Sequence, residues 1–225
     1  EVKEILAAGM GNYKALSDFI AGSGEKAGLA MRLLENVSEK DLRDGDAAIF
    51  ADHLLKAPQQ DKGLSDDIYD RYLLSPRVAN EKLSSWRTLL PELIPSAMMD
   101  KFSHNPGEIA DWIDTAITVT NTENYYNVPL TPGAVASLRM SDVLSEKIFY
   151  VALCRTLGIP ARIDPATDRT QYYLDNKWND AFLNGEKGKT QEKAFITFST
   201  RDVSPVPEYY TNFTLARLEN GRYRT

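Results

Sequence analysis

The single cysteine, Cys154, is one of three candidate nucleophiles in this chain, with Ser141 and Ser145. A thiol enzyme needs its cysteine at a helix N-terminus, where the helix dipole lowers the thiol pKa, and a nearby imidazole to take the proton. Cys154 lies instead among Val151, Leu153 and Leu157, well inside an apolar segment. Buried cysteine in such a setting behaves as a small hydrophobic residue. We therefore expect Cys154 to belong to the core.

The two histidines, His53 and His104, are the only imidazoles in the sequence. His53 follows an apolar helical pattern and is expected to be structural, and His104, in Ser-His-Asn-Pro, is expected in a loop or a helix cap. Ser141 and Ser145 are alternative nucleophiles, but a serine needs an adjacent base. One cysteine and two histidines also argue against a Cys/His zinc site. We expect no metal and no cofactor.

Most of these groups lie in one segment, residues 141–164, whose pattern predicts a buried helix, a stop and a strand. Ser141 and Asp142 are both suitable N-caps. Gly158 can adopt the left-handed conformation that ends a helix, and the proline two residues later prevents its return. Apolar residues cover most of the circumference of this helix, which is typical of a central helix: Ile148, Phe149, Val151, Ala152, Leu153 and Leu157.

The end of this segment, Cys154-Arg-Thr-Leu-Gly-Ile-Pro-Ala-Arg162, resembles the R-x-x-G-I-P-A-R segment of transglutaminase-like domains, relatives of the papain-like cysteine proteases. Three further runs are similar to a Bacteroidetes subgroup of these proteins: Leu74-Ser-Pro-Arg77, Asn124-Tyr-Tyr, and Ser145-Glu-Lys-Ile-Phe-Tyr-Val-Ala152. The resemblance implies a central helix with the nucleophilic cysteine at its N-terminal end, and strands that carry a histidine and an aspartate. It also implies an extracytoplasmic location, in the periplasm or at the cell surface.

The resemblance places the family's cysteine at Val143, which offers no nucleophile. It places the family's histidine in the region of Gln171, Tyr172 and Tyr173, which contains no histidine. Asp180 is a possible counterpart of the last member of the triad. The resemblance therefore implies that two of the three catalytic positions are replaced, and that the active site is degenerate.

A groove that has lost its catalytic groups can still hold a peptide or a glycan. The candidate residues for such a groove are Asp142, Ser145, Gln171, Tyr172 and Trp178, with the two aromatic rings as apolar contacts. Two alternatives stay open. One is an active peptidase or amide acyl-transferase with a non-standard nucleophile, and the other is a structural spacer within a larger protein.

Composition excludes few functions. The 225 residues carry a formal net charge of −6, with acidic and basic residues interspersed, so we expect no nucleic-acid partner, which would need a basic face. No apolar run approaches the length of a membrane span. The remaining partner expectations are a peptide or glycan ligand and further domains of the same chain.

Hydrophobic periodicity predicts helices before the central segment and strands after it. The predicted helices lie at about residues 1–21, 26–36, 46–56, 64–74, 75–90 and 105–117, with a short one near Leu42. Residues 118–140 are predicted to form a loop. Asp175-Asn176 is predicted to be a two-residue hairpin turn between strands at 170–174 and 177–183. Further strands are predicted at 194–198 and 209–218.

These observations predict an α+β protein. A helical region, residues 1–100, is expected to pack on a transglutaminase-like core, residues 101–185, with a central helix on an antiparallel sheet. Residues 186–225 are expected to form C-terminal β strands that continue in the full-length protein.

Overall fold

The predicted central helix is present in the computed structural model as α11, Val143–Thr156. Asp142, and not Ser141, is its N-cap, because the Asp142 carboxylate accepts a hydrogen bond of 2.9 Å from the backbone N–H of Ser145. Every residue from Ser145 to Arg155 is buried, as a central helix requires. Gly158, with a φ of +84°, ends the helix as predicted.

The structure describes residues 2–61, 63–122, 124, 126–183, 207, 212–219 and 222–224. The chain divides into two units, residues 1–187 and 188–225. In the second unit, β6 (Arg217–Glu219) and β7 (Arg222–Arg224) form an antiparallel hairpin. The predicted strand at 194–198 lies outside the described residues, as do residues 209–211 of the one predicted at 209–218. Among residues 212–218, only 217 and 218 belong to a strand, β6, so that prediction was too long.

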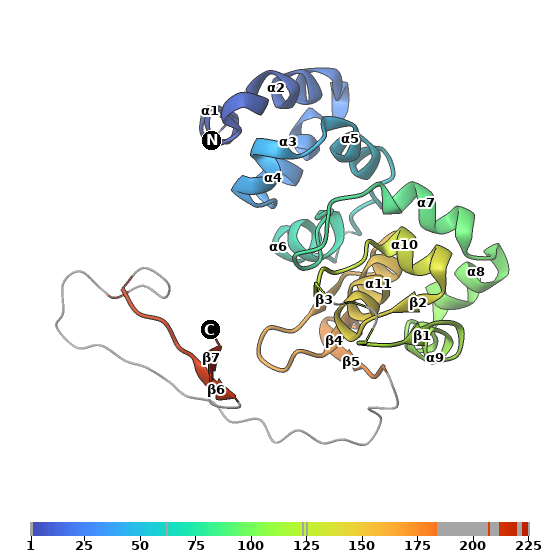
Figure 1. Cartoon of the computed structure of the whole chain (residues 1–225). Helices are drawn as coiled ribbons and strands as arrows, with labels where there is room; N and C mark the ends of the chain where they lie inside the picture. The colour runs from blue at the N-terminus through green and yellow to red at the C-terminus, as the bar shows by residue number, and fades with distance from the viewer. Residues whose placement is uncertain are drawn as a thin grey trace. The chain divides into compact units, whose positions relative to one another are not determined.

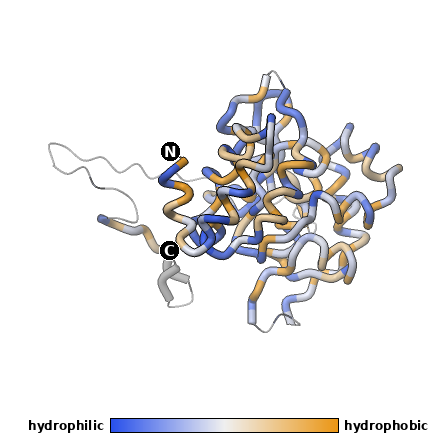
Figure 2. Tube along the Cα trace, turned by 90° about the horizontal axis from the view of Figure 1, so that it is seen from above, coloured by the Kyte–Doolittle hydropathy of each residue, from blue (hydrophilic) through white to orange (hydrophobic). Residues whose placement is uncertain are grey.

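The N-terminal helices of the first unit surround one hydrophobic cluster, which includes Leu16, Leu33, Leu34, Phe50 and Leu74. Hydrophobic and hydrophilic stretches alternate along the trace in Figure 2, as expected for helices that bury one face. These elements, seen in blue to cyan in Figure 1, are α1 (Val2–Ala8), η1 (Met10–Asn12), α2 (Tyr13–Gly22), η2 (Gly24–Lys26), α3 (Ala27–Glu35), α4 (Glu39–Asp44), α5 (Ala47–Leu55), α6 (Asp66–Tyr69) and η3 (Asp70–Leu74).

A second hydrophobic cluster surrounds α11 and includes Trp86, Phe102, Ile113, Phe149 and Leu153. The helices that contribute to it are α7 (Trp86–Leu93), α8 (Ser96–His104), α9 (Gly107–Ala116) and α10 (Pro132–Leu138). Figure 1 shows α11 enclosed between these helices and a small sheet. The central helix is therefore the axis of this second core.

The sheet beside α11 has three antiparallel strands in the order β3 (Ala161–Ile163), β4 (Thr170–Leu174) and β5 (Lys177–Ala181). Asp175 and Asn176 both have positive φ, 53° and 58°, which fits the predicted two-residue hairpin turn between β4 and β5. A separate pair of short parallel strands joins β1 (Thr118–Val119) to β2 (Met140–Ser141). The described structure thus mixes helices with small sheets, which confirms the α+β class.

One helix prediction and one loop prediction were wrong. Residues 75–85 are not helical, because one local side chain and one remote side chain bind their backbone groups. The Glu81 carboxylate accepts the N–H groups of Val78 and Ala79, both at 2.8 Å, and a buried arginine from α11 binds two carbonyls of the segment. The predicted loop at 118–140 contains α10, whose Thr131 N-cap and following proline are a start signal that the sequence does show.

Two arginines buried between the hydrophobic clusters bind backbone carbonyls. Arg155, 2 % exposed, donates to Ala161 O at 3.1 and 3.0 Å, to Ser75 O at 3.0 Å and to Arg77 O at 2.8 Å. Arg87, also 2 % exposed, donates to Arg155 O at 2.8 Å and to carbonyls at the end of η3. Burial lowers the pKa of Arg87 to about 9 and that of Arg155 to about 10, so both stay charged at neutral pH. These two side chains connect α11 to the end of η3, to residues 75–77 and to the start of β3.

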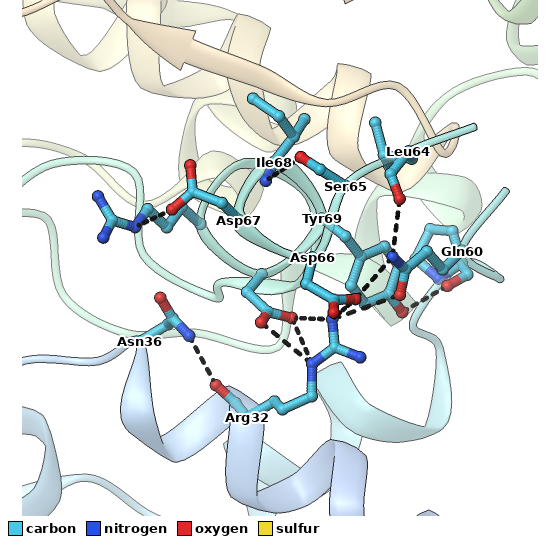
Figure 3. Close-up of polar contacts among 12 residues, drawn as sticks. Arg32, Asn36, Gln60, Leu64, Ser65, Asp66, Asp67, Ile68 and Tyr69 are labelled. Atoms are coloured by element: carbon cyan, nitrogen blue, oxygen red, sulfur yellow. Dashed lines mark hydrogen bonds and ion pairs between the residues drawn. The ribbon is translucent and has the colours of Figure 1, made fainter. Parts of the chain in front are cut away.

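A second polar cluster joins α3 to α6 and η3. The guanidinium of Arg32 lies between Asp66 and Asp70, with N–O distances of 3.0 and 2.7 Å, and over the ring of Tyr69 (Figure 3). Gln60 donates to Leu64 O and to the Asp66 carboxylate, which holds the preceding loop against the same arginine. The Arg32 cluster therefore fixes how the segment before α6 meets the N-terminal helices.

We expect Arg155→Lys to lower the free energy of unfolding by about 3 kcal/mol, because a lysine cannot reach all three carbonyls and a buried unpaired carbonyl costs about 1–3 kcal/mol. Urea denaturation measures the change. The control is Arg71→Lys, which alters an exposed ion pair with Asp67, and we expect it to change stability by less than about 0.5 kcal/mol. Equal stability of the two variants would contradict this role for Arg155.

The buried imidazole of His53 is fixed in one neutral form. Its Nδ1 lies 3.1 Å from Nε of Arg87, which can only donate, so Nδ1 accepts and Nε2 donates to Ser84 O at 2.9 Å. Burial, together with the charge of Arg87, lowers the pKa of His53 to about 3. Below about pH 6.5 the unfolded chain therefore binds a proton at His53 that the folded chain excludes.

We expect this difference to remove about 1.4 kcal/mol of stability per pH unit as the pH falls from 6.5 towards 3. Urea denaturation at pH 7 and pH 5 measures it. His53→Gln lacks the titrating group and should show a shallower decline by about 2 kcal/mol over that interval. The control is His104→Gln, which removes the other imidazole at an exposed position. The same decline in His53→Gln and the native chain would contradict the assignment.

Candidate functional site

A pocket of about 260 Å³ opens at the N-terminal end of α11. Its wall comes from the segment before α10, from the first turns of α11 and from the β3–β4 loop. The lining residues are Asn121, Asn124, Asn127, Pro129, Asp142, Val143, Leu144, Lys147 and Asp168. The pocket therefore lies where the family resemblance places the nucleophile.

Asp142 is held rigidly at the edge of this pocket. Its carboxylate accepts hydrogen bonds from the Ser145 N–H at 2.9 Å, from Ser145 Oγ at 2.6 Å and from Asn124 Nδ2 at 2.8 Å. Burial alone raises the pKa of the Asp142 carboxyl, but these hydrogen bonds outweigh it and lower the pKa below its usual value. Asp142 is thus an ionised cap and a weak base.

The first N–H groups of α11 are already used. Val143 N–H donates to Asn121 Oδ1 at 3.3 Å, and the N–H groups of Leu144 and Ser145 donate to Asp142. An oxyanion hole needs free N–H donors directed at the reacting oxygen. The first turn of α11 does not offer such donors in this arrangement.

The candidate serines are buried. Ser145 Oγ donates to Asp142 and accepts the Leu130 N–H at 2.8 Å, and the residue is 0 % exposed. A carboxylate does lie within hydrogen-bond reach of Ser145, but the hydroxyl joins the loop to the helix and is not open to the pocket. Ser141 is 2 % exposed and lies in β2.

Cys154 is buried in the core, as its sequence context predicts. The residue is 0 % exposed, and burial raises its thiol pKa to about 12. Its polar neighbour is Tyr150, whose pKa is also raised by burial. A thiol in this state is unreactive at neutral pH.

The predicted groove residues of the sheet are divided between its two faces. Tyr172 packs against the core around α11. Arg162, Gln171 and Asp180 are aligned across the three strands on the opposite face, where Arg162 Nε donates to Gln171 at 3.0 Å and Gln171 Nε2 donates to Asp180 at 2.7 Å. Trp178 is on that face as well, with the Arg162 guanidinium 4.2 Å from its ring centre.

The structure therefore does not bring the five predicted groove residues into one pocket. Asp142 lines the pocket at α11 and Ser145 lies buried behind it. Trp178 packs edge-on against Tyr72 and Tyr173, with ring centres 5.0 and 5.2 Å apart, beside Gln171. No residue of the expected histidine region, 171–173, lines the pocket.

Sequence reasoning missed the ion pair in the pocket wall. Lys147 Nζ donates to both the backbone O of Asp168, at 2.6 Å, and its carboxylate, at 2.7 Å. The only available signal was a lysine within the apolar run of a central helix, where an unpaired charge is costly. Its partner lies in a loop remote in sequence, so spacing alone could not reveal the pair.

The histidines lie elsewhere. His53 is buried among Ser84, Arg87 and Trp86, and His104 ends α8, with Nδ1 2.8 Å from Asp100 O. Among the described residues, no group of three or more His, Cys, Asp or Glu side chains could hold a metal ion. None of the described helices has the length and apolar character needed to cross a bilayer.

Comparison with models of known families, with curated proteins and with solved structures gives no match for this chain. The fold and the site together describe an α+β protein with a polar pocket at the N-terminus of its central helix.

We expect Ser145→Ala to lower the free energy of unfolding by about 1–3 kcal/mol, because the Leu130 N–H and the Asp142 carboxylate each lose a partner. Chemical denaturation measures the loss. The control is Ser103→Ala, which removes an exposed hydroxyl that donates to Asp100 O. If both variants proved equally stable, Ser145 would not be the link between loop and helix described above.

Proposed function

We propose that this chain is a transglutaminase-like module that binds a peptide or a glycan at the N-terminus of α11 without catalysis. The observation that carries the proposal is that Val143, the first residue of α11, lines the pocket. Val143, 38 % exposed, lines an open pocket exactly where the family resemblance requires a cysteine. The pocket remains while its nucleophile does not.

The chemistry of the wall favours a small polar ligand. Three asparagines, two aspartates and one lysine line the pocket beside the apolar surface of Val143, Leu144 and Pro129. Amide and charged groups of this kind bind hydroxyl and amide groups through hydrogen bonds, and the apolar patch covers carbon atoms. The volume of about 260 Å³ lies just below the range of about 300–1,000 Å³ for ligand pockets. One sugar residue or a short stretch of peptide suits this size.

The alternative is an active acyl-transferase or peptidase with Ser141, Ser145 or Cys154 as nucleophile. The Ser145–Asp142 hydrogen bond is the one observation that favours it. Against it, all three side chains are buried, and neither histidine has a described hydrogen bond to any of them. Binding therefore accounts for the arrangement better than catalysis does.

The resemblance adds a setting to the proposal. In the family subgroup that the sequence resembles, such modules belong to large extracytoplasmic proteins, and we place this module in the same setting. If the pocket binds no ligand, the remaining role is that of a purely architectural module in a larger protein.

A thermal-shift screen of short peptides and oligosaccharides tests the proposal. We expect at least one ligand to raise the melting temperature in a saturable way, because binding to the folded state stabilises it by mass action. Val143→Trp should fill the pocket and abolish the shift. The control, Met140→Trp, changes a side chain of similar exposure, 39 %, that does not line the pocket, and should retain it.

An identical ligand shift in Val143→Trp and the native chain would place the binding site elsewhere. No shift with any peptide or glycan would leave the architectural role as the better account.

A further inference from the structure

The one cation in the described wall of the pocket is Lys147. Its side chain is 10 % exposed, with its aliphatic stem in the wall of the helical core. An ammonium group so far from water needs an anionic partner. Among the described residues, Asp168 alone accepts hydrogen bonds from Lys147 Nζ, through its carboxylate and its backbone oxygen.

The partner is exposed, unlike the lysine. The Asp168 side chain is 78 % exposed, and its backbone is in the left-handed region with φ of 56°. The surrounding β3–β4 loop has hydrogen bonds that do not use this side chain. The backbone O of Asp164 accepts the Asp168 N–H at 2.8 Å, and the Asp164 carboxylate accepts from Thr167 and Arg162. The Asp168 carboxylate can therefore rotate into solvent while the loop keeps its fold.

The two members of this ion pair thus differ in what they need. Exposed ion pairs contribute little to stability, so the aspartate loses little when it returns to water. The buried lysine always needs an anion. A second carboxylate that enters the pocket can supply it, and the exchange then costs the protein no buried unpaired charge.

The other acid in the wall does not prevent this exchange. Asp142 already accepts hydrogen bonds from Ser145, from Leu144 N–H and from Asn124, and it lies at the positive end of the helix dipole. Its charge is compensated locally. With Asp168 turned outward, Lys147 is left to pair with the ligand.

We infer that the Asp168 carboxylate is a latch, meaning a counter-ion of Lys147 that a ligand can displace. The pocket selects a ligand carboxylate, which replaces the Asp168 carboxylate at Lys147 Nζ. The inference rests on the proposed binding function and names its ligand chemistry. A peptide C-terminus and a uronic acid both carry the required group. Neutral peptides and neutral sugars lack this group. An acidic ligand should therefore bind more tightly than a neutral ligand of the same shape.

Two pairs of probes test the latch by isothermal titration calorimetry: acetyl-dialanine against its C-terminal amide, and glucuronic acid against glucose. Asp168→Asn keeps a residue tolerant of positive φ and removes the competing charge. We expect this variant to bind the acidic probe about tenfold more tightly than the native chain. The reason is that the Asp168 carboxylate no longer competes with the carboxylate of the probe for Lys147 Nζ. The acid that gains affinity identifies the source of the carboxylate.

Matched variants separate the latch from general charge effects. Asp175→Asn makes the same change at another aspartate of positive φ, in the β4–β5 turn away from Lys147, and should leave affinity unchanged. Lys147→Met keeps the aliphatic stem and should abolish binding of the acidic probe, while Lys177→Met, at an exposed position of β5, should not. Circular dichroism verifies that each variant is folded.

Equal binding of the acidic and neutral probes by the native chain and by Asp168→Asn would overturn the latch but leave a polar binding site. Failure of Asp168→Asn to bind either acid would also overturn it. Binding that persists unchanged in Val143→Trp would instead contradict the proposed site itself, so the two failures are distinguishable.

Discussion

The structure depends on the hydrogen bonds of the buried Arg155 guanidinium. Arg155 ends the apolar body of α11 and binds the carbonyls of Ser75, Arg77 and Ala161. A planar group with five donors can satisfy carbonyls from separate segments at once. It thereby holds residues 75–77 of the irregular segment and the start of β3 against the end of α11. These contacts lie between the two hydrophobic clusters.

The segment at the end of α11 has a structural role of its own. The Arg-x-x-Gly-Ile-Pro-Ala-Arg segment supplies a helix end, a turn and a strand, and its first arginine is a structural tie. None of these functions involves the opposite end of α11. In the N-terminal turn, Asp142 and Asn121 occupy the first N–H donors, and Val143 lines the pocket.

The pocket combines rigid and replaceable parts. Asp142 lines it and is held by two hydrogen bonds that the buried Ser145 donates to its carboxylate. Lys147 and Asp168 form a pair in which the cation is buried and the anion is exposed. Such an asymmetry is unnecessary for stability, since an apolar residue would fill the same wall at lower cost. It is useful where the anion has to be exchanged.

The sequence by itself determined the elements with strong local signals. These were the central helix with its glycine end, the Asp175–Asn176 hairpin, the buried state of Cys154 and the α+β class. Local periodicity and turn chemistry are sufficient for such features because they act within a few residues. The transglutaminase-like origin remains a proposal.

Only the tertiary structure decided the rest. Residues 75–85 are not helical, and Arg155, 78–80 residues away in sequence, binds the carbonyls of Ser75 and Arg77. Tyr172 and Trp178 were predicted to line one groove but lie on opposite faces, a separation that the hairpin register, with Trp178 opposite Tyr173, already implies. Which of the two faces meets α11 was decided only by the folded chain. The pairing of Lys147 with Asp168 joins residues from separate elements, and no local pattern encodes a contact that only the folded chain creates.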